Sequence, residues 1–425
     1  MEDRASKETL KVLVIDEEVP YPPDAGKRIR TWNLLKSLAQ RHQVHLLCYG
    51  REQDSSSIAL RSAGIVLHLV DPLQGSKGFW LYIRLLANLF SPYPFSVTKH
   101  YSRRFRVAFN KLLKSGPWDL IHCEWTPYAR FISSRPITPT VIATHNVESQ
   151  IWKRRAQCSA RFFERIFFRL QAAKMLWFER CALRRATAVT AVTDADAETM
   201  RKWGVRAVTV VPNGVDLPTY LAIDDQSEDE NQILSVASLD WFPNADALEY
   251  FVGEIFPSIR KAQPKSVFRI VGRRPPESLK ARLSTMPGID FVGEVKDVRP
   301  YLDRAAVVVV PLRIGGGSRL KILEALAAGK AVVSTSIGAE GLGLNPGKDV
   351  LIADSPQDFA RSVIELLLRK GARQELGVNG RKVVTERYGW NEIGRLLEAV
   401  WWEAAGQQSD NELVGAPARE SYARS

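Results

Sequence analysis

The sequence predicts an α/β protein made of two doubly wound, Rossmann-like domains that face each other across a cleft. Its 425 residues are enough for two or three domains at roughly 100 to 200 residues each. In both halves, short apolar runs alternate with longer stretches of helical periodicity. Apolar strands separated by crossover helices are typical of a parallel sheet covered on both faces. We therefore expect a ligand site at the carboxyl ends of the strands, in the cleft.

The first domain is expected over residues 10–213, after a disordered segment of residues 1–9. Its strands are expected where β-branched and aliphatic residues follow one another. They are VLVID (12–16), VHLLCY (44–49), LIHCE (120–124), TVIAT (140–144), AVTAVT (188–193) and VTVVP (208–212). The first strand leads through a loop with Gly26 into a helix. At the last-but-one strand, we expect Thr193 or Asp194 to cap a helix, in preference to a metal site at Asp194–Asp196.

Residues 214–231, which include an acidic, weakly apolar run from Asp224, are expected to be the interdomain linker, and the second domain is expected over 232–388. Its predicted strands are residues 233–238, 267–272, 290–293, 307–311, 331–335 and 350–353. Its predicted helices are residues 245–261, 276–283, 298–304, 318–328 and 356–369. A helix over 389–405 is expected to cross back to the first domain, followed by a disordered tail, 406–425.

Composition and charge limit the possible partners. The chain is 45% apolar and 25% charged, which is ordinary for a globular protein. Its net charge of +12 favours anionic partners such as nucleotide phosphates or acidic lipid head groups. No DNA-binding or RNA-binding motif accompanies the charge, so we expect no nucleic-acid partner. The start does not resemble a secretory signal and no apolar run is long enough to span a membrane, which predicts a cytoplasmic protein.

The four cysteines lie far apart in the sequence. None forms a C-x-x-C pair, and no His/Cys cluster has metal-ligand spacing. We expect them to be reduced thiols, buried or half-buried. They are Cys48, Cys123, Cys158 and Cys181.

A glycine triplet at 315–317 is expected to turn a strand into a helix that begins near Ser318. Glycines let backbone amides approach a ligand, and helix N-termini favour phosphate. Arg319 and Lys321 add positive charge there, and Glu324 is placed to accept hydroxyls of a ribose. The alternative is a plain glycine-rich turn followed by a solvated basic helix face.

Several segments in one order resemble family 4 glycosyltransferases of GT-B fold, from about Lys11 to Trp401. They are HNVES (145–149), RRATAVTAVTDADAE (184–198), PNGVD (212–216), VGRRP (271–275), FVGEVKDVRPYL (291–302) and LKILEALAAGKAVVST (320–335). The resemblance implies sugar transfer from a nucleotide sugar, with retention of anomeric configuration and without an essential metal or other cofactor.

The resemblance also implies roles for single residues. His145 and Asn146 would meet the donor sugar, with Gly26 near the diphosphate. Arg273 would approach the phosphates or ribose, and Val295 the base. Each of these residues could instead be an ordinary strand-end or loop residue.

The sequence departs from the family pattern at two places. Family members carry two glutamates eight positions apart, but the first position is Gly316 here and the second is Glu324. We expect the amides of Gly317 and Ser318 to take over the sugar contacts. The Arg and Lys that usually follow the first strand of the second domain are replaced by Ser238 and Asn244. Arg319 and Lys321 are therefore our candidates for stabilising the leaving diphosphate, and with His145 they form the predicted catalytic set.

The stretch from Arg161 to Arg185 is a basic amphipathic helix by its spacing. One face carries Arg161, Arg165 and Arg169, which could contact an anionic membrane surface or the acceptor. The alternative is a helix that packs on the domain core, and in either case we expect Trp177 in the core. The residues of the apolar face are Phe163, Ile166, Phe167, Leu170, Trp177 and Cys181.

These observations predict a retaining, metal-independent glycosyltransferase, of hexosyltransferase type, at the cytoplasmic membrane face. It would use a glycan or lipid-linked acceptor in the synthesis of a cell-surface polysaccharide or glycolipid. A catalytically weak or inactive GT-B protein that binds nucleotide sugar or glycan is the alternative. A nicotinamide-dependent oxidoreductase is disfavoured because no G-x-G-x-x-G follows a strand.

Overall fold

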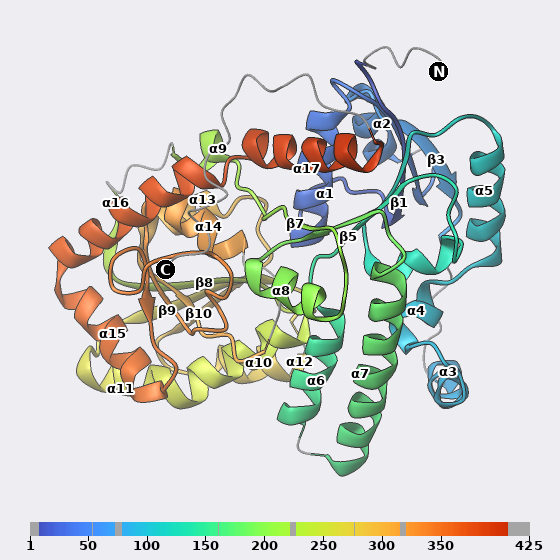
Figure 1. Cartoon of the computed structure of the whole chain (residues 1–425). Helices are drawn as coiled ribbons and strands as arrows, with labels where there is room; N and C mark the ends of the chain where they lie inside the picture. The colour runs from blue at the N-terminus through green and yellow to red at the C-terminus, as the bar shows by residue number, and fades with distance from the viewer. Residues whose placement is uncertain are drawn as a thin grey trace. The chain divides into compact units, whose positions relative to one another are not determined.

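The computed structural model describes residues 8–52, 54–72, 79–159, 161–221, 227–275, 277–314 and 320–406. Two compact units make up the chain (Figure 1). The N-terminal unit runs to Pro212 and resumes at Asn391, and the C-terminal unit comprises Asn213–Trp390. Each unit contains one parallel sheet.

The described part of the N-terminal unit has a seven-stranded sheet in the order β3-β2-β1-β4-β5-β6-β7. All six predicted strands are present. The edge strand β3 was not predicted, although its sequence VLHLV is apolar at every position except His68. The strands are β1 Lys11–Glu18, β2 Gln43–Tyr49, β3 Val66–Val70, β4 Leu120–Cys123, β5 Thr140–Ala143, β6 Ala188–Ala191 and β7 Val208–Val210.

Helices connect these parallel strands, as parallel pairing requires. At the start of α8, the Thr193 hydroxyl accepts a hydrogen bond from the Asp196 amide, so the predicted helix cap is confirmed. The helical segments of this unit are α1 Gly26–Leu38, α2 Ser55–Ser62, α3 Phe79–Leu89, α4 Phe95–His100, α5 Arg103–Lys114, η1 Thr126–Phe131, α6 Glu148–Cys158, α7 Phe162–Leu183, α8 Asp194–Lys202 and α17 Trp390–Ala404.

The C-terminal unit has a six-stranded parallel sheet among its described residues, in the order β10-β9-β8-β11-β12-β13. The strands are β8 Asp229–Ser238, β9 Val267–Arg273, β10 Ile289–Gly293, β11 Ala305–Val310, β12 Ala331–Ser334 and β13 Leu351–Ile352. The helical segments are α9 Leu217–Leu221, α10 Phe242–Tyr250, η2 Phe251–Ile255, α11 Phe256–Ala262, α12 Glu277–Ser284, α13 Arg299–Arg304, α14 Leu320–Ala327, α15 Pro356–Leu368 and α16 Lys370–Arg387.

Two boundaries in this unit differ from the prediction. The expected linker, 214–231, contains α9 and the first residues of β8. The single helix expected over 245–261 is divided into α10, a π-helical segment and α11. Pro257 lies in the first turn of α11, where its missing N–H leaves no helical hydrogen bond unmade.

The buried face of α7 is not the face that the sequence predicts. Phe163 is 83% exposed and Trp177 is 52% exposed, so the expectation that Trp177 lies in the core is wrong. Gln171, Met175 and Phe178 are buried instead. Polar partners explain the burial of Gln171, whose amide bonds Asn88 and the Phe95 backbone at 2.9 and 2.7 Å.

The C-terminal helix α17 packs on the N-terminal unit through its last turns. Trp401 is fully buried, and Glu398 bonds Arg41 and His42 at 2.9 Å each. Cys48 and Cys123 are buried free thiols and Cys181 is a half-buried one. Within the described ranges, no helix is long and apolar enough to cross a membrane.

We predict opposite effects for two glycine substitutions in α16. A Cβ at Gly377 would lie 1.9 Å from the Gly329 carbonyl oxygen, whereas a Cβ at Gly371 would meet nothing within 4 Å. Gly377→Ala should lower the free energy of unfolding by roughly 1 to 3 kcal/mol because backbone must move. Gly371→Ala, the matched control, should be neutral or stabilising by up to about 1 kcal/mol. Urea denaturation of the full chain measures both, and equal effects would contradict the packing described.

Candidate active site

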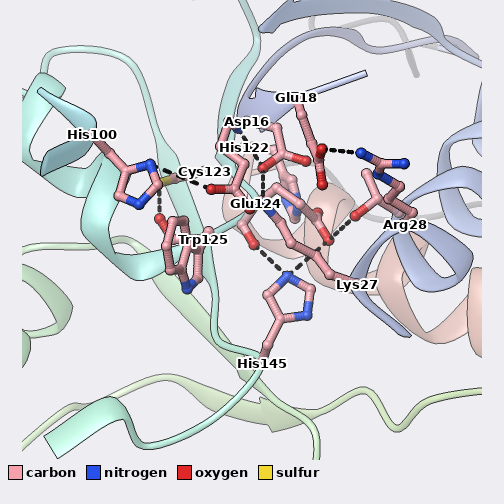
Figure 2. A network of polar contacts seen from close by, with 12 residues as sticks. Asp16, Glu18, Lys27, Arg28, His100, His122, Cys123, Glu124, Trp125 and His145 are labelled. Carbon is pink, nitrogen blue, oxygen red and sulfur yellow. Dashed lines mark hydrogen bonds and ion pairs between the residues drawn. The ribbon is translucent and has the colours of Figure 1, made fainter. Parts of the chain in front are cut away.

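A lysine shared by two carboxylates lies at the carboxyl end of β1. Lys27, in the first turn of α1, donates to Asp16 at 2.5 Å (Figure 2) and to Glu17 at 2.9 Å. The strand order reverses between β1 and β4, which makes this end of the sheet the topological switch point where such folds bind ligands. The Lys27 ammonium also lies 4.9 Å from the centre of the Trp125 ring.

Lys27 is the one cation that bonds both Asp16 and Glu17, and the two carboxyl groups differ in their pKa. Burial raises the pKa of Asp16 to about 7, against the effect of Lys27 and with the help of the charges on Glu124 and Glu17. The pKa of Glu17 is lowered, because Lys27 and His100 outweigh its burial. Glu17 is therefore the ionised partner of Lys27 at neutral pH, and Asp16 can exchange a proton there.

Glu124 follows β4 directly and is almost completely buried. Its carboxylate accepts hydrogen bonds from Thr31 at 3.0 Å and from the His122 ring at 2.7 Å. Burial alone would raise its pKa, but the bond from His122 and the nearby positive groups hold the pKa at about 2. The carboxylate is ionised at any physiological pH.

The partners of His122 fix which ring nitrogen carries the proton. The Trp401 indole N–H can only donate, and it contacts Nδ1 of His122 at 3.1 Å. Nδ1 is therefore the acceptor, and Nε2–H donates to Glu124. Helix α17 is in this way linked through His122 to the carboxylate at the end of β4.

His145 lies just beyond β5 and is oriented by the same residue. Its Nε2 lies 2.7 Å from the Glu124 carbonyl oxygen and 3.4 Å from the Glu124 carboxylate (Figure 2). Nε2 must carry the hydrogen, because a carbonyl only accepts, so Nδ1 is the acceptor of the neutral ring. Burial lowers the pKa of His145 to about 4. At neutral pH the ring can bond hydroxyl groups but adds no positive charge.

The start of α6 is capped by a side chain of α7. Glu179 accepts from the backbone amides of Glu148 and Ser149 at 2.7 and 3.1 Å. Burial raises the pKa of Glu179 to about 8. These two amides are therefore already bonded, and Asn146 bonds the Glu148 side chain. Gly26 is the exposed first residue of α1, next to Lys27.

In the C-terminal unit, two of the predicted site residues meet at the ends of β8 and β9. Lys321 donates to Asn244 at 2.8 Å, and Asn244 in turn donates to the Ser238 carbonyl at 2.8 Å. Arg273 donates to the Ser238 hydroxyl at 3.1 Å. Ser238 and Asn244 thus hold the two cations beside the switch point between β8 and β11.

The backbone next to this cluster is strained. Arg274 has φ of 51°, a left-handed conformation that is unfavourable for a residue with a side chain. Such conformations persist where the surrounding structure enforces them, often at functional sites.

Two further predicted site residues of this unit that the structure describes, Glu324 and Val295, have different neighbours. Glu324 is hydrogen-bonded to Tyr220, and burial raises its pKa against the effects of Tyr220 and Lys321. Val295 lines a cavity of about 380 Å³ together with Arg269 and Tyr301. Glu324 thus has a hydroxyl group and an ammonium group as neighbours in a buried position.

Part of the predicted donor site lies outside the described residues. These positions are Gly316, Gly317, Ser318 and Arg319. The described part of α14 begins at Leu320. On the first turns of α7, Arg161 and Arg169 are exposed, whereas Arg165 is half-buried and bonds the Ser159 carbonyl at 3.1 Å.

Sequence reasoning missed the acidic side chains at the centre of the N-terminal site. Asp16 and Glu124 each come directly after an apolar strand, in VLVID and LIHCE. That position alone could have marked them, since parallel strands end at one edge of the sheet. Lys27 carried no such signal, because only the fold brings its helix beside those strand ends. Among the described residues, no group of three or more His, Cys, Asp or Glu side chains is arranged to hold a metal ion.

Family models match both units of the chain. Residues 26–218 match the model described as Glycosyltransferase Family 4, and residues 230–369 match Glycosyl transferases group 1. The chain is a GT4-like glycosyltransferase of GT-B fold. This agrees with the resemblance drawn from the sequence motifs.

Individual relatives are distant but match most of the glycosyltransferase. An uncharacterized 44.6 kDa protein in the cps region of Klebsiella pneumoniae is 22% identical over 391 residues, 89% of this chain and 96% of its own. Anabaena HepE with UDP-glucose has a TM-score of 0.65 at 14% identity, covering 92% and 99% of the two chains. S. aureus TarM with fondaparinux, α-GlcNAc-glycerol and UDP has a TM-score of 0.65 at 11% identity, covering 92% and 99%. At these identities, the two structures establish the fold alone.

We predict that the His145 ring titrates near pH 4, below the ordinary value of 6.5. Because the ring is neutral in the folded chain and protonated in the unfolded chain between these values, its burial should reduce stability as the pH falls from 6.5 to about 4. Carbon–proton NMR spectra of ¹³C-histidine-labelled glycosyltransferase measure the pKa, with the signal assigned by His145→Gln.

Glu124→Gln tests the physical cause of the His145 pKa. The Glu124 charge raises the His145 pKa against the effect of burial, so its removal should lower that pKa further. A His145 pKa at or above 6.5 would contradict the neutral, buried ring.

Proposed function

We propose that this glycosyltransferase moves a sugar from a nucleoside diphosphate sugar to a glycan or lipid-linked acceptor with retention of configuration and without a metal cofactor. One observation carries the proposal: in each unit, polar side chains gather at the switch point of a parallel sheet, where doubly wound folds bind nucleotides and their substrates. The solved relatives of this fold that contain UDP-glucose or UDP support a nucleotide-sugar donor.

The chemistry that we propose depends on cations. Breaking the anomeric C–O bond develops negative charge on the leaving diphosphate, which preorganised N–H and ammonium donors stabilise. Lys321 and Arg273 are held beside the C-terminal switch point, and Arg319 is the further candidate. In the proposed front-side displacement, the leaving phosphate takes the acceptor proton. His145, as a neutral ring, would bond a hydroxyl of the donor sugar.

A cavity in the N-terminal unit is our candidate acceptor site. It has a volume of about 640 Å³ and is lined by the aromatic residues Tyr21, Tyr49 and Tyr101 together with Glu17 and Glu18. Aromatic faces pack against the C–H faces of sugars, and carboxylates accept their hydroxyl groups. Glu17 lines this cavity and also accepts a hydrogen bond from Lys27. This arrangement supports a glycan acceptor.

We further propose that the enzyme works at the cytoplasmic face of an anionic membrane, in the synthesis of a cell-surface polysaccharide or glycolipid. The apolar stripe of α7 that contains Phe163, Ile166 and Leu170 is exposed to solvent. Arg161 and Arg169 are exposed on the same helix. Apolar residues next to basic ones on an exposed helix favour an anionic lipid surface.

Glu324→Ala should weaken binding of the nucleotide by roughly 10- to 100-fold, because a hydrogen-bond acceptor for the ribose is lost. Calorimetry with UDP, GDP and ADP measures it. Glu365→Ala, which removes an exposed carboxylate paired with Arg369, is the control and should bind as the wild type does. Unchanged affinity in Glu324→Ala would remove Glu324 from the donor site.

Nucleotide binding without hydrolysis or transfer of any nucleotide sugar would favour the binding-protein alternative, which Gly316 motivates.

Flotation with vesicles tests the membrane placement. The triple variant Arg161→Gln, Arg165→Gln, Arg169→Gln should bind vesicles with 30% phosphatidylglycerol at least tenfold more weakly, at about 1 kcal/mol per basic residue. Binding should fall with added salt. Flotation of the wild type without anionic lipid would contradict this part of the proposal. Equal flotation of the wild type and the triple variant would contradict it as well.

A further inference from the structure

A second cavity of the N-terminal unit lies away from the candidate active site. It has a volume of about 290 Å³ and lies between α7 and the loop that follows η1. Thr140, the first residue of β5, lines it, whereas His145 lies beyond the last residue of the same strand. The cavity is therefore at the amino ends of the strands, and substrates of this fold bind at the carboxyl ends.

Arginines are the charged residues in this lining. Arg130 and Arg185 line the cavity, and no acidic residue is among the described lining residues. The Arg130 guanidinium lies 4.0 Å from the Tyr93 ring centre and 4.3 Å from that of Tyr101. Burial lowers its pKa, and the groups that influence it include no carboxylate. The two tyrosine rings hold the cation in place and leave it available to an anion.

The remaining lining fits a phosphate that bears an apolar substituent. Ser133 and Ser134 offer hydroxyl groups on the loop, while Ile132, Ile142 and Phe178 form apolar wall. Hydroxyl and guanidinium groups are donors to phosphate oxygens, and arginine binds phosphate in a fork geometry. The lining therefore suits a phosphate ester as ligand.

The cavity adjoins the exposed stripe of α7. Trp177 lines the cavity and is 52% exposed, and Ile166 and Leu170 precede it on the same helix at helical spacing. Tryptophan favours the boundary between apolar chains and polar head groups. An occupant that contacts both the cavity and the stripe carries phosphate and apolar chains in one molecule.

We propose that this cavity binds the phosphate head group of an anionic phospholipid while the α7 stripe contacts the acyl chains. The proposal rests on the membrane placement proposed above and adds a specific lipid site to it. The two arginines would pair with the phosphodiester, and the serines would bond its remaining oxygens or the head-group hydroxyls.

The first test compares two variants that lose the same charge. Arg130→Gln with Arg185→Gln should bind phosphatidylglycerol vesicles about tenfold more weakly than the wild type. Lys111→Gln with Lys114→Gln, on α5 and outside the cavity lining, should stay within about twofold, because generic attraction of distant charges is screened by salt. Equal losses in the two variants would overturn the proposal.

The second test uses a thiol inside the cavity and does not depend on an arginine variant. Cys181 is half-buried in the lining, whereas Cys48 and Cys123 are buried. In a Cys158→Ser background, N-ethylmaleimide labelling of Cys181, followed by mass spectrometry, should slow at least fivefold with phosphatidylglycerol vesicles but not with phosphatidylcholine vesicles. Equal protection by inorganic phosphate or glycerol phosphate would indicate a soluble anion site, and protection by an acidic peptide alone would indicate a protein partner. Either result would overturn the lipid assignment.

The tests separate this inference from the function on which it rests. Wild-type protein that does not float with any anionic vesicle overturns both the membrane placement and the lipid site. Flotation lost in the Arg161, Arg165 and Arg169 variant but kept in the Arg130 and Arg185 variant overturns the lipid site alone. Sugar transfer to a soluble acceptor should be retained by Arg185→Gln alone, because Arg185 does not line the candidate acceptor cavity.

Discussion

The N-terminal unit is organised around one buried carboxylate, that of Glu124. Thr31 of α1 and His122 of β4 donate to its side chain, and His145 donates to its backbone carbonyl. Through His122 the same network reaches Trp401 of α17. Leaving a buried carboxylate without one of its hydrogen bonds costs more than the roughly 1 to 3 kcal/mol that a buried neutral group loses. The first helix, the last helix and the candidate catalytic histidine are therefore stabilised by a single ionised group.

Charge at this site is divided between fixed and exchangeable groups. Glu124 and Glu17 stay ionised, His145 stays neutral, and the pKa of Asp16 lies at about 7. Burial causes the pKa shifts of Asp16 and His145, whereas hydrogen bonds and neighbouring charges outweigh burial at Glu124 and Glu17. A neutral histidine can bond hydroxyl groups without adding positive charge to this cluster.

Two polar residues position the cations of the C-terminal unit. Ser238 and Asn244 hold Arg273 and Lys321 by hydrogen bonds. Positive charge is thereby fixed near the switch point. The strained backbone at Arg274 lies beside this cluster, which agrees with a site whose geometry is imposed by its surroundings.

The sequence by itself determined the two parallel sheets, because continuous apolar strands and helix-period stretches reflect burial on both faces of a sheet. It also marked His145, Arg273, Lys321 and Glu324 through motif order. It did not reveal the π-helical segment that divides the helix before Pro257, and the edge strand β3 was missed although it is apolar except at His68.

Tertiary structure alone decided which face of α7 is buried and which side chains surround the site. Apolar spacing predicted that Trp177 lies in the core, but Gln171 and Glu179 find buried hydrogen-bond partners on other elements and turn that face inward. The sharing of Lys27 by Asp16 and Glu17, and the link from α17 to Glu124, join residues up to hundreds of positions apart. Such pairings depend on distances in space, which periodicity along the chain does not encode.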